Sequence, residues 1–142
     1  MGAAGFDPRR FLDRFGHEGH MGAIGLRYVA HEADWVELAI DEIVGPNEAA
    51  GQRRLLLGPV TSLVDMAGLL SVWNDSGRQR PVVTSDLRIN YLRETITGST
   101  IHARARCHGN TETVVFVEGV VHLGNYDEPV ASFLVTYMQV SP

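Results

Sequence analysis

Residues 58–73, GPVTSLVDMAGLLSVW, form a stretch that is apolar or small at nearly every position. A helix that is apolar on almost all sides is a buried helix, so this stretch predicts a helix in the centre of a fold. Its only ionisable residue is Asp65. An unpaired carboxylate in a core is costly, so Asp65 must be hydrogen-bonded, paired with a cation, or directed at a cleft.

Helical spacing divides this stretch into two faces. The apolar face carries Val60, Leu63, Val64, Ala67 and Leu70. The second face is small and polar, with Gly58, Thr61, Ser62, Asp65 and Gly68. Small residues leave room for a ligand, which makes Asp65 a candidate general base or nucleophile. The alternative is a structural carboxylate that a neighbouring strand or subunit satisfies.

Composition bounds the class of protein. The 142 residues suit one domain over 1–142, and 44% hydrophobic with 20% charged residues is ordinary for a globular fold. A net charge of −5 without any basic run argues against nucleic acid. The single cysteine, Cys107, excludes an internal disulfide. Without a secretion signal or an apolar run of ~20 residues, we expect a soluble cytoplasmic protein that does not enter membranes.

The flanking segments alternate between strand and turn signals. A short helix is predicted at about 8–16, with Asp7 as its N-cap. Strands are predicted at about 24–31, 34–42, 82–93, 99–108, 112–123 and 129–140. Turns are expected at 45–47, 109–110 and 124–127. The predicted class is α+β: a curved antiparallel sheet of about six strands wrapped around the long central helix.

Period-2 alternation in two of these strands predicts which side chains share a face. In the strand at 82–93, Val83, Ser85 and Leu87 are expected on one buried face, with Thr84 and Asp86 opposite. In the strand at 99–108, His102 and His108 fall on the polar face and are expected to be solvated.

Four sequence pieces occur in order and at ordinary spacing. They are SLVDMA at 62–67, VTSDLRINYLR at 83–93, a hairpin segment at 98–109 and EPVA at 128–131. Together they resemble the hotdog-fold acyl-CoA thioesterases of the PaaI (phenylacetate-degradation) type. The resemblance covers roughly residues 11–140 and implies a hotdog fold that hydrolyses acyl or aryl thioesters to free acid and CoA.

The resemblance also implies roles for particular residues. Asp65 would act as general base or nucleophile, and backbone N–H groups of Leu57 or Gly58 would bind the carbonyl oxygen. Thr84 of a partner subunit would lie near the acid, with its neighbour Ser85 as the rival. The family's water-holding Asn falls at Ala50 without a gap, so Asn47 is the catalytic candidate if the loop is longer, and Gln52 is another.

One departure from the family pattern supports an alternative function. Members usually carry His-Gly-Gly before the helix, where this chain has Leu56, Leu57 and Gly58. The alternative is a hotdog module that binds acyl-CoA or lipid without cleaving it. A hotdog dehydratase ranks lower, because residues 43–57 contain no His.

The resemblance further implies ligands and assembly. Arg54, Arg88 and Arg93 are candidates for the CoA phosphates, because Arg suits bidentate phosphate contacts. The expected partners are an acyl-CoA or acyl-carrier thioester and a second copy of the chain, as a homodimer or dimer of dimers. No cofactor is expected. His17 and His20 have metal-like spacing, but no third ligand is visible, so no metal is expected either.

Overall fold

The computed structural model describes residues 5–41, 57–93 and 99–140. Its helices are α1 (Pro8–Phe15), α2 (Gly19–Ala23) and α3 (Leu57–Ser76). Its strands are β1 (Arg27–His31), β2 (Val36–Asp41), β3 (Val82–Tyr91), β4 (Thr100–Asn110), β5 (Val114–His122) and β6 (Ala131–Gln139). The expected order of elements is confirmed, apart from α2, and the turn expected at 45–47 lies outside the described residues.

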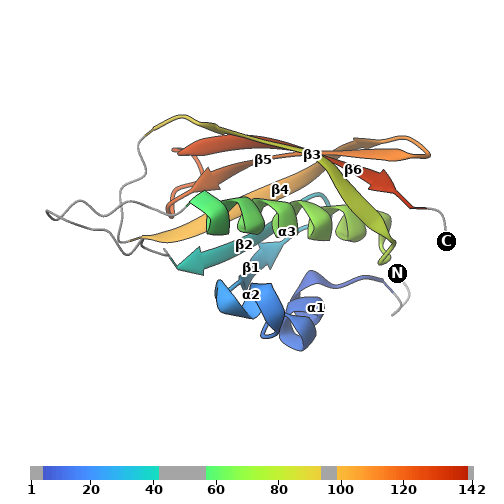
Figure 1. Cartoon of the computed structure of the whole chain (residues 1–142), viewed down its shortest axis with the longest axis horizontal. Coiled ribbons are helices and arrows are strands. Elements are labelled where there is room, and N and C mark those ends of the chain that lie inside the picture. The colour runs from blue at the N-terminus through green and yellow to red at the C-terminus, as the bar shows by residue number, and fades with distance from the viewer. Residues whose placement is uncertain (1–4, 42–56, 94–98, 141–142) are drawn as a thin grey trace, which may run out of the picture.

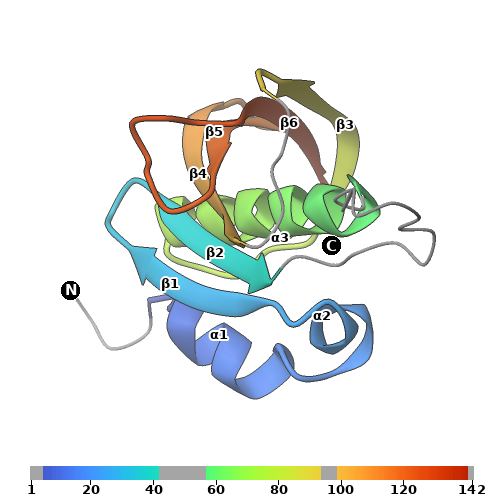
Figure 2. The ribbon, with the colours of Figure 1, turned by 90° about the vertical axis from the view of Figure 1, so that its left-hand side faces the viewer.

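The six strands form one antiparallel sheet in the order β1-β2-β4-β5-β6-β3. The sheet curves around α3, which runs along its concave face, while α1 and α2 lie beyond β1 (Figures 1 and 2). This is the hotdog fold that the resemblance implied. Because the strand that follows α3 pairs with the last strand of the chain, β3 becomes one edge of the sheet.

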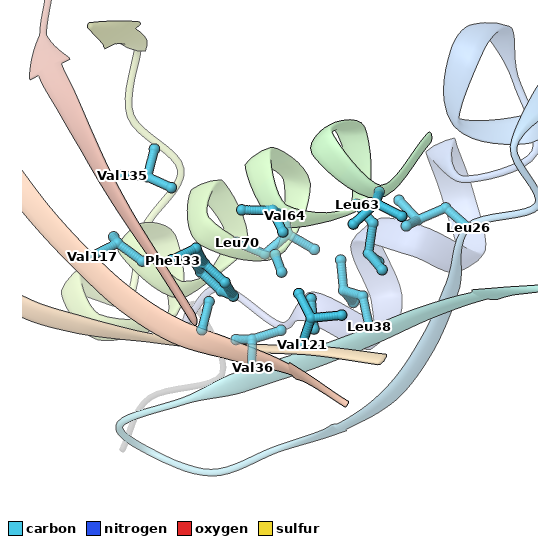
Figure 3. Packing of buried hydrophobic residues seen from close by; sticks show 14 of the residues in the cluster. Leu26, Val36, Leu38, Leu63, Val64, Leu70, Val117, Val121, Phe133 and Val135 are labelled. Atoms are coloured by element: carbon cyan, nitrogen blue, oxygen red, sulfur yellow. The ribbon is translucent and has the colours of Figure 1, made fainter. Parts of the chain in front are cut away.

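The apolar face of α3 meets the inner face of the sheet. Leu63, Val64 and Leu70 are completely buried and point toward Val121 and Phe133 of the sheet (Figure 3). Burial of side chains of this size stabilises a fold by about 1.5–3 kcal/mol each. The apolar pattern of α3 therefore fixes which side of the helix faces the sheet, and it leaves the small and polar stripe for other contacts.

The N-terminal segment contains one helix more than expected. In α1 the Asp7 side chain accepts hydrogen bonds from the N–H groups of Arg9 and Arg10, which confirms the predicted cap. The short α2 follows, and Gly25 then adopts a left-handed backbone at φ 68°. Because this turn uses residues up to Gly25, β1 begins at Arg27 rather than at residue 24.

A bulge interrupts β3 between Thr84 and Asp86, where its register against β6 shifts by one residue. The alternation predicted for this strand is therefore wrong at its start. Val83 is 51% exposed, whereas Leu87 and Ile89 pack against the core. The extra residue changes the side of the sheet on which the preceding side chains lie.

The predicted turn at 109–110 is also displaced. Gly109 and Asn110 still pair with β5, after a register shift that follows Cys107. The chain reverses at Thr111, whose hydroxyl accepts hydrogen bonds from the N–H groups of Thr113 and Val114. A threonine hydroxyl can thus stabilise a turn that the Gly-Asn pair was expected to make. At 124–127 the expected turn is present, with Gly124 at φ 117°.

Candidate functional site

The Asp65 carboxylate lies in the middle of α3 and is hydrogen-bonded on one of its two oxygens. The Thr84 hydroxyl donates to Asp65 Oδ1 at 2.8 Å. The Tyr137 hydroxyl lies 2.7 Å from the Asp65 backbone carbonyl and 3.2 Å from Oδ1. Among the described residues no hydrogen bond reaches Oδ2, and Asp65 is only partly buried. One carboxylate oxygen is thus held while the other is available to a water or a substrate.

Thr84 reaches Asp65 from the same chain, which corrects the expectation that it comes from a partner subunit. The bulge after Thr84 puts this residue on the helix side of β3, together with Leu87. Ser85 donates instead to the backbone carbonyl of Thr136 at 3.1 Å. The structure therefore favours Thr84 over Ser85 as the hydroxyl beside the acid.

Tyr137 and Gly68 complete this site, and sequence reasoning did not identify Tyr137 as part of it. Tyr137 is 1% exposed, and burial, reinforced by the charge of Asp65, raises the pKa of its phenol. The phenol therefore stays a neutral donor. A Cβ at position 68 would lie 2.3 Å from the Tyr137 hydroxyl oxygen, so only glycine leaves space for this contact. The signal in the sequence is the small residue one turn after the acid.

We expect Thr84→Val to lower kcat/KM roughly 10-fold for any reaction that uses the Asp65 carboxylate, because it removes a donor to a charged group at nearly constant volume. Ser85→Ala is the matched control and should change kcat/KM less than 2-fold. Steady-state kinetics of the two variants make this comparison. A larger loss in Ser85→Ala than in Thr84→Val would contradict the placement of Thr84 beside the acid.

Gly68→Ala should destabilise the protein by about 1–3 kcal/mol, since the added methyl group displaces the Tyr137 hydroxyl. Helix propensity alone predicts the opposite change, because alanine stabilises a helix interior by roughly 1 kcal/mol relative to glycine. Urea unfolding of Gly68→Ala, Tyr137→Phe and the double variant tests the contact. We expect Tyr137→Phe to offset part of the Gly68→Ala loss, and strictly additive effects would refute the contact.

The N-terminus of α3 presents backbone donors. Leu57 and Gly58 are the first two residues of the helix, where N–H groups have no partner within a helix. Leu57 is 50% exposed, and Pro59 has no N–H to offer. The hydroxyls of Thr61 and Ser62 donate to the carbonyls of Leu57 and Gly58, which does not occupy these donors.

The remaining candidates occupy different places. Asn47 and Arg54 lie outside the described residues. Arg88 lies on the face of β3 opposite Leu87 and Ile89, so it points away from α3, and Arg93 is exposed just after the strand. His20 lies 2.8 Å from the Ser62 hydroxyl rather than beside a cluster of ligands.

A second polar cluster lies on the outer face of the sheet and was missed, because its members are far apart in the sequence. Glu37 is 5% exposed and is surrounded by His102 at 3.2 Å, His122 at 3.1 Å and Arg104 at 2.8 Å. Burial opposes the charge of Glu37, but the hydrogen bonds from His122 and Arg104 outweigh it and lower its pKa to about 2. His102 is therefore not solvated as expected, and burial lowers its pKa.

Although Glu37, His102 and His122 have ligand atoms within 4.8 Å of one another, their geometry does not suit a metal ion. The two imidazole rings are stacked 4.6 Å apart at 11°, and lone pairs in nearly parallel planes do not converge on one ion. His122 Nδ1 accepts from the N–H of Gly124, so a neutral ring carries its proton on Nε2, toward Glu37. These three side chains form a hydrogen-bonded network around a carboxylate.

Comparison with known proteins identifies the family. A model of the thioesterase superfamily matches residues 58–129, and the chain belongs to this superfamily. The match includes nearly all of α3 and three of the six strands, β3, β4 and β5. No curated protein matches the chain. None of the helices in residues 5–41, 57–93 and 99–140 combines the length and the hydrophobicity that a membrane-spanning helix needs.

Several solved structures share the fold at low sequence identity. A Pseudomonas aeruginosa protein is 24% identical with a TM-score of 0.76, covering 93% of this chain and 96% of its own. A Haemophilus influenzae thioesterase is 17% identical with a TM-score of 0.80, covering 97% and 94%. The PaaI protein of E. coli, from the phenylacetic acid degradation operon, is 15% identical with a TM-score of 0.71, covering 93% and 89%. These similarities show that the fold is shared.

Proposed function

We propose that this protein is an acyl-CoA thioesterase that hydrolyses an acyl or aryl thioester to free acid and CoA. The observation that carries the proposal is the Asp65 carboxylate, whose Oδ1 is held by Thr84 and Tyr137 and whose Oδ2 accepts no hydrogen bond from the part of the chain that the structure describes. Membership of the thioesterase superfamily supports the reaction class. A thioester needs little help to expel its sulfur, because a thiol with a pKa near ~8.5 is a good leaving group.

In the proposed reaction Oδ2 of Asp65 either takes a proton from water or attacks the thioester carbonyl directly. Water attack forms the new C–O bond and a tetrahedral intermediate whose former carbonyl oxygen is negative; collapse of this intermediate breaks the C–S bond, and the thiolate leaves with the electron pair. Direct attack breaks the C–S bond, expels the thiolate and leaves the acyl group on Asp65 as a mixed anhydride, which water then cleaves to the free acid and the Asp65 carboxylate. Thr84 and Tyr137 keep the carboxylate in place throughout, and helix N–H groups stabilise the oxygen that becomes negative.

The distance along α3 favours a site built from two copies of the chain. Leu57 and Gly58 lie about two turns before Asp65, and at 1.5 Å per residue the separation is roughly 10 Å. A reacting carbonyl must lie about 3 Å from both its oxyanion donors and the attacking group. We therefore infer that Leu57 and Gly58 of a second copy act with Asp65. The long exposed edge of β3 offers a surface for pairing two copies as a homodimer.

The reaction is tested by thiol release from a panel of short, medium, long and aryl acyl-CoAs. Hydrolysis that saturates with substrate and ranks the acyl groups is the expected result. Acyl-CoA binding without thiol release would show instead that the protein is a non-catalytic acyl-CoA-binding module, the alternative that the missing His-Gly-Gly motif favours. The same panel with acyl-carrier protein thioesters distinguishes CoA from a carrier protein as the thiol.

The two-copy site is tested by complementation. Gly58→Pro removes one proposed oxyanion donor, and Asp65→Asn removes the base, so each variant alone should be nearly inactive. Mixed dimers of the two variants contain one site with neither defect. We expect such mixtures, after co-refolding or co-expression, to recover a substantial part of the wild-type kcat. Mixed dimers that stay inactive would show that the donors and the acid belong to one chain.

A further inference from the structure

A groove crosses the outer face of the sheet, on the side opposite α3. Its cavity volume is about 420 Å³. One row of side chains across it follows the strand register, with Arg104 opposite Val120, Val120 opposite Ser132 and Ser132 opposite Asn90. Directly paired residues share a face of a sheet, so all four side chains face the groove. Glu118 and Leu134 lie in the next row.

Arg104 is held rigidly at one end of this groove. Its guanidinium lies 3.8 Å from the centre of the Trp35 ring and 4.3 Å from that of Tyr126. Its Nε donates to the buried Glu37 at 2.8 Å. Because its side chain is already ordered, Arg104 loses little conformational entropy when a ligand binds. Its side chain is still 28% exposed, and Arg104, Trp35 and Tyr126 all line the cavity.

The charges around the groove limit what it can bind. Arg106 also lines it and pairs with Asp34. Glu118 lines it as well and lies 3.4 Å from His108. The three carboxylates of Glu37, Asp34 and Glu118 outnumber the two arginines, so a ligand with one negative charge fits better than one with two. Arg104 offers planar donors that match a carboxylate, and Val120 with Leu134 offers an apolar floor for a carbon body.

We propose that this groove binds a small organic carboxylate, with its anionic group on Arg104 and its carbon body across Val120 toward Leu134. This site is separate from Asp65, on the opposite face of the sheet. A buried charged network such as that of Glu37 rarely adds stability over apolar residues of similar volume. The Glu37 network lies behind Arg104, and its role in this proposal is to hold the Arg104 guanidinium in position for the ligand.

Titration of the ¹⁵N-labelled protein with benzoate, hexanoate, phenyl phosphate and inorganic phosphate tests the groove. We expect saturable shifts of the amide signals of Val120, Ser132 and Asn90 with benzoate and hexanoate. Arg104→Gln should weaken binding at least 10-fold, because it removes a charged donor pair. Arg27→Gln, which removes an exposed arginine paired with Asp41, is the matched control and should leave binding unchanged.

A second variant keeps the test independent of the buried network. Val120→Phe fills the groove without touching Glu37 and should also abolish the shifts. Absence of shifts with all four probes would overturn the proposal, as would equal binding by wild type and both groove variants. Tighter binding of phenyl phosphate than of benzoate would refute the charge assignment. If a second copy of the chain covers this face instead, the wild type will bind no carboxylate, and Val120→Phe will lower the molecular mass of the assembly in solution. That result would also overturn the proposal.

Discussion

Asp65→Asn should lower kcat/KM for thioester hydrolysis by roughly 10²–10⁴-fold, the usual contribution of a general base. The amide keeps the shape of the side chain and an oxygen that accepts from Thr84 and Tyr137. It has no charge with which to take a proton from water or attack a carbonyl. The change therefore separates the chemistry of the acid from its structural contacts. Steady-state thiol release with the preferred acyl-CoA measures the effect.

The control for Asp65→Asn is its folding stability. Because both hydrogen bonds to Oδ1 can persist, we expect the midpoint of thermal unfolding to change by only a few degrees. Substrate affinity should also be retained, so the loss should appear mainly in kcat. Turnover close to that of the wild type would remove Asp65 from the reaction and leave it as a structural carboxylate, the alternative that its position in an apolar helix allows.

Glu37→Gln should destabilise the protein by about 3–5 kcal/mol, the cost of breaking a buried ion pair by removing one partner. The change leaves the Arg104 guanidinium in a half-buried position without its counter-charge. The amide keeps only one oxygen, so one of the two carboxylate acceptors, Oε2 for His102 or Oε1 for His122 and Arg104, is replaced by an NH2 donor. For a chain of this length the expected fall in Tm is roughly 10 °C. Urea unfolding at pH 7 gives the free energy.

The matched control for Glu37→Gln is Asp41→Asn, which breaks the exposed pair with Arg27 and should cost less than about 1 kcal/mol. The pH dependence provides a second check. The pKa of Glu37 falls from 4.5 to about 2 on folding, so its charge stabilises the fold above pH 4.5, and this is lost as pH falls toward 2. The gap of about 3 kcal/mol between wild type and Glu37→Gln should therefore narrow in acid. A gap that stays constant down to pH 3 would contradict the lowered pKa.

Much of the fold could be predicted because its signals are local. The apolar run at 58–73 predicts a buried helix, and period-2 patterns predict the strands, which the structure confirms to within a few residues. The order of the strands depends on pairings between distant segments, so these local patterns did not predict it. The short α2 escaped prediction because Gly19–Ala23 has neither a side-chain cap nor an apolar face.

The site could be predicted only in part. Asp65 is conspicuous as the only charged residue in the apolar stretch at 58–73, and Thr84 follows from its resemblance to the family strand. Tyr137 is separated from Asp65 by 72 residues, so no local pattern connects them. The Glu37 network unites three strands through their register, and alternation alone suggested solvated polar residues there. A polar residue on an outer face is exposed only when nothing covers it, and here Trp35 and Tyr126 flank Arg104.

The bulge in β3 has a consequence for how this chain is aligned with its relatives. Up to Thr84 the even-numbered residues of β3 face α3, whereas from Asp86 onward the odd-numbered residues face it. A relative without the bulge would carry the equivalent hydroxyl one position nearer to the residue that matches Leu87. Alignment by sequence letters alone would then match Ser85 with that hydroxyl. Positions before and after the bulge are therefore best compared by which side of the sheet they face.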